Sequence, residues 1–334
     1  MAVDCGRKYK MLEKKHALKE TVLAYKIALK SKMMGKPVGD RPVYIAMIDG
    51  SAVHGGMCDR FKAIISLYAY CKYTGNPFRI KYTYPFKLED YLSPATYDWR
   101  IKEGEYTDNP RYSRILYMRK EYLARRLLKL KTQKQIHFYG NRDSLAYINE
   151  SFLGQGNASG AFTWGGLFRE LFRPGPVLEE RIQAVSAELG DNYDAAVFRF
   201  QNLLGDFKEY SFKSIGDKSE AEKLIEKCLQ AIKALKADMG DRALLVTSDS
   251  VTFLQRAVQI EGVHIIPGKL VHMDGCKDEP VENKYEIYLK SFLDFYVLSG
   301  ARKIYRIGTS YMYPSEFPMY AAKVHDIPFE SIVI

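Results

Sequence analysis

The sequence predicts an α/β protein of two facing, doubly wound Rossmann-like domains. The chain has 334 residues, more than one typical domain, and 47% of them are hydrophobic, which is enough for a full core. Short apolar runs of strand length alternate with amphipathic helical stretches, as in a parallel sheet with crossover helices. The alternation resumes after the break RPGP at residues 173–176. We therefore divide the chain into residues 1–42, 43–173 and 174–334.

The first segment, residues 1–42, contains a predicted basic amphipathic helix over residues 7–36. Leu18, Val22, Tyr25 and Leu29 recur at helical spacing and form an apolar stripe. Lysines flank the stripe: Lys14, Lys15, Lys19, Lys26, Lys30, Lys32 and Lys36. In one interpretation the helix packs on the body with its lysines in water, which is the commoner fate of a lysine-rich face. In the other it contacts anionic lipid headgroups.

The second segment opens with a predicted strand, a glycine-rich turn and a helix. The strand is VYIAMI at residues 43–48, and Gly50, Gly55 and Gly56 follow it before Asp59 begins the helix. Glycines let backbone N–H groups approach an anion at a helix N-terminus, although neither GxGxxG nor GK[ST] is present. A phosphate-binding turn and an ordinary βα corner are equally compatible with this stretch.

The rest of this domain is predicted from the same alternation. It comprises a strand at 78–84, an irregular segment at 87–110, a basic helix at 112–131, a strand at 135–139, a loop at 151–163 and a short helix at 164–172. His137 lies within an apolar strand, so we expect a packed core histidine rather than a metal ligand.

The third segment repeats the strand–helix pattern. We expect strands at 194–200, 243–247, 263–266 and 303–307, and helices at 176–189, 219–237, 251–258, 285–298 and 314–324. Ligands of doubly wound sheets bind outside the carboxyl ends of the strands, so two such domains predict a site in the cleft between them.

Polar residues end or follow three strands of the third segment. Arg199 offers a bidentate fork for a diphosphate, and Asp249 could accept from a ribose hydroxyl or a base N–H. Backbone N–H groups near Ser315 could hold the second phosphate. The alternative is purely structural: Arg199 is solvated at a strand end, while Asp249, Ser250 and Ser315 cap the helices that follow them.

Taken in order, these segments resemble the fucosyltransferase-like superfamily of GT-B glycosyltransferases. That superfamily includes α-1,6-fucosyltransferases, nodulation fucosyltransferases and protein O-fucosyltransferases. The resemblance covers roughly residues 43–325. The matching positions are Gly55, Gly56, Asp59 and Arg60 (GGxGDR type), Arg199, Gly205 and Asp206 (HxRxGD type), Thr247, Ser248 and Asp249 ([ST]-[SD]-D), and Gly308, Ser310, Ser315, Phe317 and Ala321 (GxS…SxF…A). The histidine of HxRxGD is Val197 here, and additional residues separate Arg199 from Gly205.

The resemblance implies transfer of fucose from GDP-fucose to a glycan hydroxyl, with inversion and without a metal or a cofactor. It implies an acceptor side on residues 43–173 and a donor side on residues 174–334. The implied donor-binding residues are Gly55, Gly56, Arg60, Arg199, Asp249, Ser250, Ser310, Ser315 and Phe317. Arg199 would also act catalytically by stabilising the leaving diphosphate, and His54, Asp59 and Asp206 are candidates for the base that takes the acceptor proton.

The net charge and the motifs that are absent limit the alternative functions. The formal net charge of +10 suits an anionic partner, namely a nucleotide, a nucleic acid or an acidic membrane surface. A different nucleotide-sugar donor on the same fold is the first alternative. The second is a non-enzymatic nucleic-acid-binding protein, which the lack of RNP, KH and zinc-finger motifs disfavours, so we expect no nucleic acid partner. No DxD-type carboxylate pair stands alone after a strand, so we expect no metal site.

The expected location is the cytoplasm. Five scattered cysteines without a CxxC pair fit a reducing compartment. The chain starts without a signal-peptide-like segment, and no apolar run has the length needed to span a bilayer. An acceptor that is a lipid-linked glycan would place the protein peripherally at the inner face of the membrane.

Overall fold

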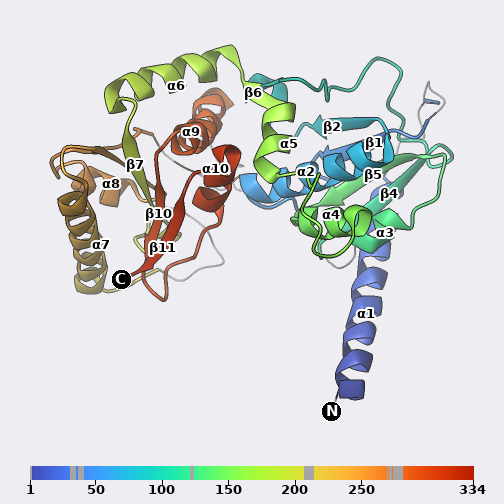
Figure 1. Ribbon diagram of the computed structural model, residues 1–334, viewed down its shortest axis with the longest axis horizontal. Helices are drawn as coiled ribbons and strands as arrows, with labels where there is room; N and C mark the ends of the chain where they lie inside the picture. Colours follow the sequence, from blue (N-terminus) through green and yellow to red (C-terminus); the bar gives the residue numbers. More distant parts are fainter. Residues whose placement is uncertain are drawn as a thin grey trace. The chain divides into compact units, whose positions relative to one another are not determined.

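The computed structural model describes residues 2–30, 35–36, 41–120, 124–206, 214–268, 270, 273 and 281–334, and Figure 1 shows its elements. The chain folds into two units. The N-terminal unit comprises Met1–Asp90 and Pro94–Arg173, and the C-terminal unit comprises Tyr91–Ser93 and Pro174–Ile334. The chain therefore passes between the units three times. A short two-stranded sheet of β3 (Leu92–Pro94) and β6 (Phe172–Pro174) lies at these passages.

The N-terminal unit is built on a parallel four-stranded sheet with the order β2–β1–β5–β4. Its strands are β1 (Tyr44–Ile48), β2 (Phe78–Tyr82), β4 (Ser113–Met118) and β5 (Gln135–Gly140). From β1 the chain moves outward to β2 and later returns through β4 to β5, on the other side of β1. The order thus reverses between β1 and β5, and such a switch point is where open α/β sheets bind ligands.

Helices cover both faces of this sheet. On one face, α2 (Met57–Thr74) is buried along most of its length, and its Tyr70 ring lies 5.4 Å from that of Tyr44. On the other face, α1 (Ala2–Ala28) packs Ala24 and Ile27 against a cluster that includes Val43, just before β1, and residues of β1, β4 and β5. The remaining elements are η1 (Leu88–Asp90), α3 (Arg125–Leu128), α4 (Leu145–Leu153) and α5 (Trp164–Leu171). In the described part of the chain, no helix is both long and apolar enough to cross a membrane.

The predicted basic helix at residues 112–131 is wrong. Residues 113–118 form the edge strand β4, and only Arg125–Leu128 are helical in the described part of this stretch. The apolar run from Ile115 to Met118 pairs in parallel with β5, with Ile115 opposite His137. Tertiary pairing outweighs the weak helical periodicity of the interspersed arginines, because propensity is only a weak prior.

The C-terminal unit contains a parallel five-stranded sheet with the order β11–β10–β7–β8–β9. Its strands are β7 (Tyr193–Phe198), β8 (Ala243–Ser248), β9 (Val263–His264), β10 (Ile304–Gly308) and β11 (Phe329–Val333). Its helices are α6 (Pro176–Leu189), α7 (Lys218–Met239), α8 (Val251–Ala257), α9 (Val281–Ser299) and α10 (Phe317–His325). The strand β11 was not predicted. The strand order reverses between β7 and β10, which places this unit's switch point there.

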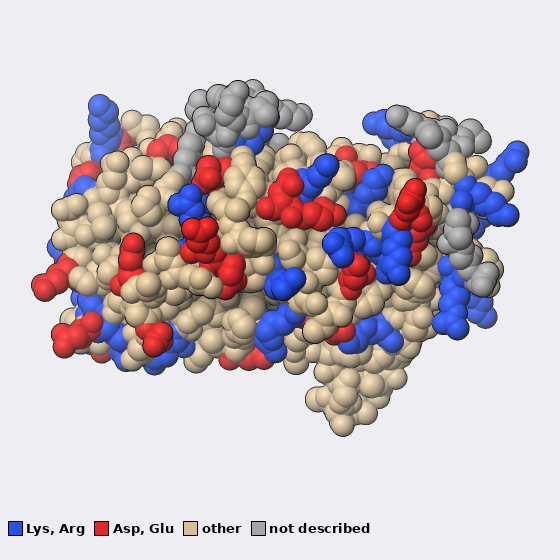
Figure 2. Space-filling model, turned by 90° about the horizontal axis from the view of Figure 1, so that it is seen from above, with Lys and Arg blue, Asp and Glu red and all other residues tan. Residues whose placement is uncertain are grey.

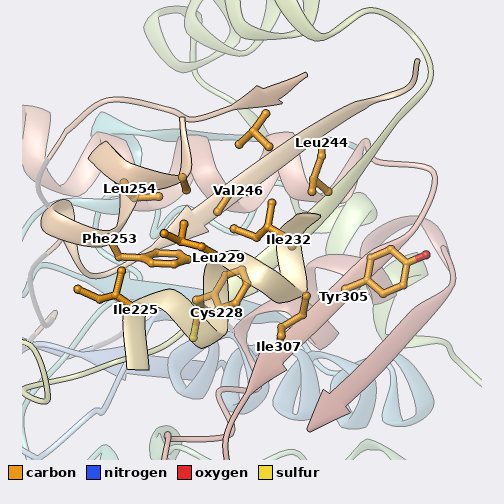
Figure 3. Close-up of a cluster of buried hydrophobic side chains, with 14 of the residues drawn as sticks. Ile225, Cys228, Leu229, Ile232, Leu244, Val246, Phe253, Leu254, Tyr305 and Ile307 are labelled. Atoms are coloured by element: carbon orange, nitrogen blue, oxygen red, sulfur yellow. The ribbon is translucent and has the colours of Figure 1, made fainter. Parts of the chain in front are cut away.

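Strand alternation builds the core of this unit. Successive side chains of a strand point to opposite faces, so every second residue of β7, β8 and β10 meets α7 and α8. Figure 3 shows this cluster, in which the strand residues Leu244, Val246, Tyr305 and Ile307 lie among Ile225, Cys228, Leu229 and Ile232 of α7 and Phe253 and Leu254 of α8. This core holds the carboxyl ends of the central strands in place.

Residues Tyr91–Ser93 complete the C-terminal unit although they precede it by some 80 residues of sequence. The Tyr91 ring is buried and lies 5.0 Å from the ring of Tyr285 and 4.9 Å from that of Phe292. Its carbonyl accepts the N–H of Gly175 at 2.7 Å. A Cβ on Gly175 would lie 3.0 Å from that oxygen, so this close approach favours glycine.

His137 is the packed core histidine that the sequence predicted. It is 3% exposed, its ring stacks 5.1 Å from that of Tyr106, and its Nε2 lies 2.9 Å from Gln135 Oε1. Burial, assisted by the positive charge of Lys81, lowers the pKa of His137 from 6.5 to about 4.

This shift predicts a loss of stability in mild acid. The unfolded chain takes up a proton on His137 at a higher pH than the folded protein does. The stability from the neutral imidazole is therefore complete above pH 6.5 and is lost as the pH falls through about 4. The total is roughly 3 kcal/mol. Urea unfolding across this range should show the slope in the native protein and a reduced slope in His137→Phe. Equal slopes would contradict the assignment.

Candidate functional site

Three neighbouring strands of the C-terminal unit end in the residues that the sequence singled out. Arg199 follows β7, Asp249 follows β8, and Ser310 lies two residues beyond the end of β10. Because β10, β7 and β8 are adjacent and parallel, their carboxyl ends share one edge of the sheet. That edge contains the switch point between β7 and β10, so Arg199 lies where a doubly wound sheet binds its ligand.

Asp249 organises the loop that carries Arg199. Its buried carboxylate accepts the N–H of Phe200 at 2.8 Å on Oδ1 and the N–H of Gln201 at 2.6 Å on Oδ2. Oδ2 also lies 3.1 Å from a terminal nitrogen of Arg199. Burial raises the pKa of Asp249, and the Arg199 charge and the two amides act in the opposite direction.

These contacts give Asp249 a positioning role that the sequence did not predict. Both of its oxygens bond within the protein, whereas the sequence assigned them to a ribose or a base. Nucleoside recognition by Asp249 stays a prediction. Arg199 keeps 23% of its side chain exposed and can reach a ligand while its other side rests on Asp249. Gln201, with a φ of 53°, takes the left-handed conformation that is uncommon outside glycine, and its amide is fixed by Asp249.

Asp206 and Ser250 together cap α8. The Ser250 hydroxyl donates to Asp206 Oδ2 at 2.8 Å and accepts the N–H of Phe253 at 3.1 Å. The same Asp206 oxygen accepts the N–H of Thr252 at 2.8 Å. Ser250 is fully buried, so the helix-capping alternative for this residue is confirmed. Asp206 accepts a backbone N–H of the C-terminal unit in this cap, and its role as a base stays a prediction.

The loop between β10 and α10 uses its amides internally. The N–H of Ser315 donates to the Tyr313 carbonyl at 2.8 Å, and the N–H of Phe317 donates to the Ser315 hydroxyl at 3.2 Å. Pro318 has no N–H. These contacts differ from the expectation that amides near Ser315 would hold a phosphate, because two of those amides are already hydrogen-bonded. The Phe317 ring packs 5.6 Å from that of Phe295.

Two hydroxyls at the end of β10 are better placed for a ligand. Ser310 is exposed. Thr309 is 7% exposed, and its hydroxyl has no hydrogen-bond partner among the described residues. A buried hydroxyl without a partner is costly, so a ligand or water is expected to satisfy it. The sequence placed Ser310 at the site and missed Thr309.

Arg306 is a second arginine of this edge that the sequence analysis missed. Its guanidinium donates to the carbonyls of Pro314 and Ser315, both at 3.2 Å, and to the hydroxyl of Ser331 at 2.9 and 3.1 Å. It therefore fixes the loop that carries Ser310 and Ser315. The sequence contains a sign of this role, because Arg306 interrupts the apolar strand KIYRI. Arg199 likewise stands next to an apolar run.

In the N-terminal unit, His54 lies at the switch point between β1 and β5. It is 1% exposed, its Nε2 accepts the N–H of Gly50 at 3.1 Å, and its ring stacks 6.2 Å from that of Tyr139. The Tyr139 hydroxyl donates to Asp49 Oδ2 at 2.9 Å. Asp49 and Tyr139 were not predicted. The imidazole nitrogen that a base would use is occupied by the turn itself, and catalysis by His54 stays a prediction.

Asp59 is the more accessible candidate base of this unit. Its side chain is 36% exposed and pairs with Lys62 Nζ at 2.9 Å. Gly55 has a φ of 79°, a conformation that favours glycine, and a Cβ there would lie 2.6 Å from Asp59 Oδ2 and force that side chain to move. Gly56 caps α2 with no side chain, as a phosphate-approaching turn would need.

Arg60 ties this turn to the end of β2. It is 1% exposed, and its guanidinium donates to the carbonyls of Gly55 and Tyr84 at 3.1 and 2.7 Å and to the Tyr82 hydroxyl at 2.9 Å. The sequence assigned Arg60 to the donor, whereas this geometry gives it a structural role. Donor contact by Arg60 stays a prediction.

Comparisons with known proteins identify the fold. No known protein family profile matches the chain, and no curated protein matches its sequence. The NodZ α-1,6-fucosyltransferase of Bradyrhizobium, in crystals soaked with GDP-fucose, matches with a TM-score of 0.51 and 13% identity over 85% of this chain and 92% of that chain. A mutant of Arabidopsis thaliana FUT1 in complex with GDP matches with a TM-score of 0.53 and 13% identity over 97% of this chain and 76% of that chain. The chain thus has the two-domain GT-B fold of fucosyltransferases that its motifs predicted.

Proposed function

We propose that this protein is an inverting, metal-independent glycosyltransferase that moves fucose from GDP-fucose to a hydroxyl of a glycan. The observation that carries the proposal is the place of Arg199, partly exposed beside the switch point of the C-terminal sheet. Support comes from the fold shared with fucosyltransferase structures that hold GDP or were soaked with GDP-fucose. The matching motif order in the sequence adds to it.

In the proposed reaction, the acceptor hydroxyl oxygen attacks the anomeric carbon of the sugar on the face opposite the diphosphate. The bond from this carbon to the diphosphate oxygen breaks, and its electron pair leaves with GDP. Arg199 donates charge-assisted hydrogen bonds to the leaving diphosphate and supplies the positive charge that a divalent cation would otherwise provide. The acceptor proton passes to a carboxylate, for which we favour Asp59, because His54 is buried and Asp206 caps α8.

The proposed partners are a nucleotide-sugar donor on the C-terminal unit and a glycan or lipid-linked glycan acceptor on the N-terminal unit. We propose no nucleic acid partner. A cytoplasmic location, peripheral at the inner face of the membrane, belongs to the same proposal. Its support is that Cys58, Cys71 and Cys228 are free thiols.

A different nucleotide-sugar donor is the second candidate function. It is favoured by the contacts of Asp249, the residue expected to select the nucleoside. Its carboxylate accepts the N–H groups of Phe200 and Gln201 and pairs with Arg199. The geometry around Arg199 suits any diphosphate, because a guanidinium fork does not distinguish bases.

Nucleotide binding distinguishes these functions. We expect GDP to raise the melting temperature more than UDP or CMP do, because the proposed site binds GDP most tightly. A ligand at 100 times its Kd adds about 2.7 kcal/mol of stability, which a thermal melt detects. Equal or larger stabilisation by UDP would contradict the GDP assignment.

Transfer assays run in EDTA should retain turnover. Turnover that is lost in EDTA and restored by Mn²⁺ would contradict metal independence. Salt-sensitive binding of polynucleotides without any mononucleotide binding would favour a nucleic-acid-binding protein.

A further inference from the structure

The helix α1 carries an apolar stripe that the described parts of the protein leave uncovered. Leu18, Val22, Tyr25 and Leu29 are between 46% and 67% exposed. At about 100° per residue, the four side chains lie within roughly 60° of one another around the helix axis. Large apolar side chains that gather on one exposed face mark an interaction surface more often than single exposed ones do.

The opposite face of α1 is the one that packs on the N-terminal unit. Glu20 is 4% exposed and accepts the N–H of Arg119 at 2.7 Å and a guanidinium N–H of Arg126 at 3.2 Å. Ala24 and Ile27 pack beside it against the sheet. The helix packs on the body with its lysines exposed, as one of the two interpretations held, but Glu20, Ala24 and Ile27 make the contact and the predicted stripe does not.

The exposed charge beside the stripe has a single sign. Within residues 14–30, the exposed charged side chains are Lys14, Lys15, Lys19, Lys26 and Lys30. The acidic residue of this range, Glu20, is buried in its pair with Arg126. By contrast, acidic and basic side chains are interspersed on the face of the protein that Figure 2 shows. An exposed apolar stripe edged by lysines is complementary to a surface that is anionic outside and apolar beneath.

We propose that this surface, the α1 stripe with its lysines, docks the protein on a membrane rich in acidic lipid, with the helix axis along the interface. Leu18, Val22, Tyr25 and Leu29 enter the boundary between headgroups and acyl chains, and the lysines bind the acidic headgroups. The tyrosine suits this depth, because its ring is apolar and its hydroxyl stays hydrated. A second copy of the chain is disfavoured as the occupant, since it would bring the same lysines and a net charge of +10.

Vesicle sedimentation of the full chain tests the proposal. We expect binding to phosphatidylcholine vesicles that contain phosphatidylglycerol, little binding to pure phosphatidylcholine, and release at high salt. The triple variant Lys15→Glu, Lys19→Glu, Lys26→Glu should lose at least tenfold in affinity, because three attractive contacts with acidic headgroups become repulsive. Its matched control is Lys223→Glu, Lys227→Glu, Lys233→Glu on the exposed side of α7, which changes the net charge equally and should bind as the native chain does.

A second pair of variants tests the stripe itself. Leu18→Ser with Leu29→Ser should weaken vesicle binding, whereas Val177→Ser with Val258→Ser, at exposed apolar positions of the C-terminal unit, should not. Thermal melting of every variant verifies folding. Native-like binding by the Leu18/Leu29 variant, or equal loss in the α7 control, would overturn the proposal. Absence of binding to acidic vesicles would also overturn it. In that case, a dimer seen by light scattering, or binding of an acidic protein, that is lost in the Leu18/Leu29 variant would identify a different occupant of the stripe. None of these outcomes depends on donor binding, which is measured separately.

Discussion

Arg199→Ala is expected to lower the rate of sugar transfer about 10²–10³-fold while the protein stays folded, the loss typical of removing one donor to developing negative charge. The guanidinium is the partly exposed cation at the carboxyl edge of β7 on which the proposed departure of the diphosphate depends. The measurement is initial transfer rate at saturating donor, together with GDP binding. Arg199→Lys should recover only part of the rate, because an ammonium group cannot form the bidentate fork.

The same substitution also carries a stability cost that must be separated from the catalytic one. It leaves the buried Asp249 carboxylate without its cation, and breaking a buried pair costs about 3 kcal/mol at the lower end of the usual range. The two amide contacts of Asp249 survive, so we expect a lower melting temperature with retained structure. A folded Arg199→Ala protein with the native transfer rate would remove Arg199 from the mechanism.

Asp249→Asn is expected to destabilise the C-terminal unit by about 2–4 kcal/mol and to abolish donor binding. The carboxylate accepts two backbone N–H groups and the Arg199 charge at once. An asparagine keeps a single acceptor oxygen and turns an NH₂ group towards one of these donors. Chemical unfolding gives the stability, and GDP titration gives the binding.

Asp217→Asn provides the matched control for this carboxylate. Asp217 caps α7 by accepting the N–H of Ser219 at 2.7 Å, so its loss should cost at most about 1 kcal/mol and leave GDP binding intact. The double variant of Arg199→Ala with Asp249→Asn should be less destabilised than the sum of the single variants, because both remove one shared pair. Strict additivity would show that the two side chains do not act as a unit.

The architecture was predictable because its signal is local. The alternation of apolar strands with amphipathic helices is visible within windows of about ten to eighteen residues. The strand β4 escaped because arginines around a short apolar run imitate a helical pattern, and the strand β11 because its half-exposed edge lacks a continuous apolar run. In both cases the deciding contact comes from a neighbouring strand that is distant in sequence.

The roles of the site residues were less predictable for the same reason. The sequence shows that Asp249 follows a strand, but it does not show that the loop after β7 folds back onto that carboxylate. Helical periodicity likewise identified the apolar stripe of α1 without indicating which face packs. The packing face is centred on Glu20, and a buried glutamate is a poor sequence signal for a contact surface.

The short segment Tyr91–Ser93 limits how far this protein can be treated as two exchangeable modules. Splitting the chain at residue 173 to make a chimera would remove the ring that lies beside Tyr285 and Phe292, and the carbonyl that accepts the Gly175 N–H. A transplanted C-terminal half would lack the aromatic ring that stacks on Tyr285 and Phe292. Recombination between proteins of this fold therefore needs three coordinated junctions, with the 91–93 tripeptide inherited from the same parent as residues 174–334.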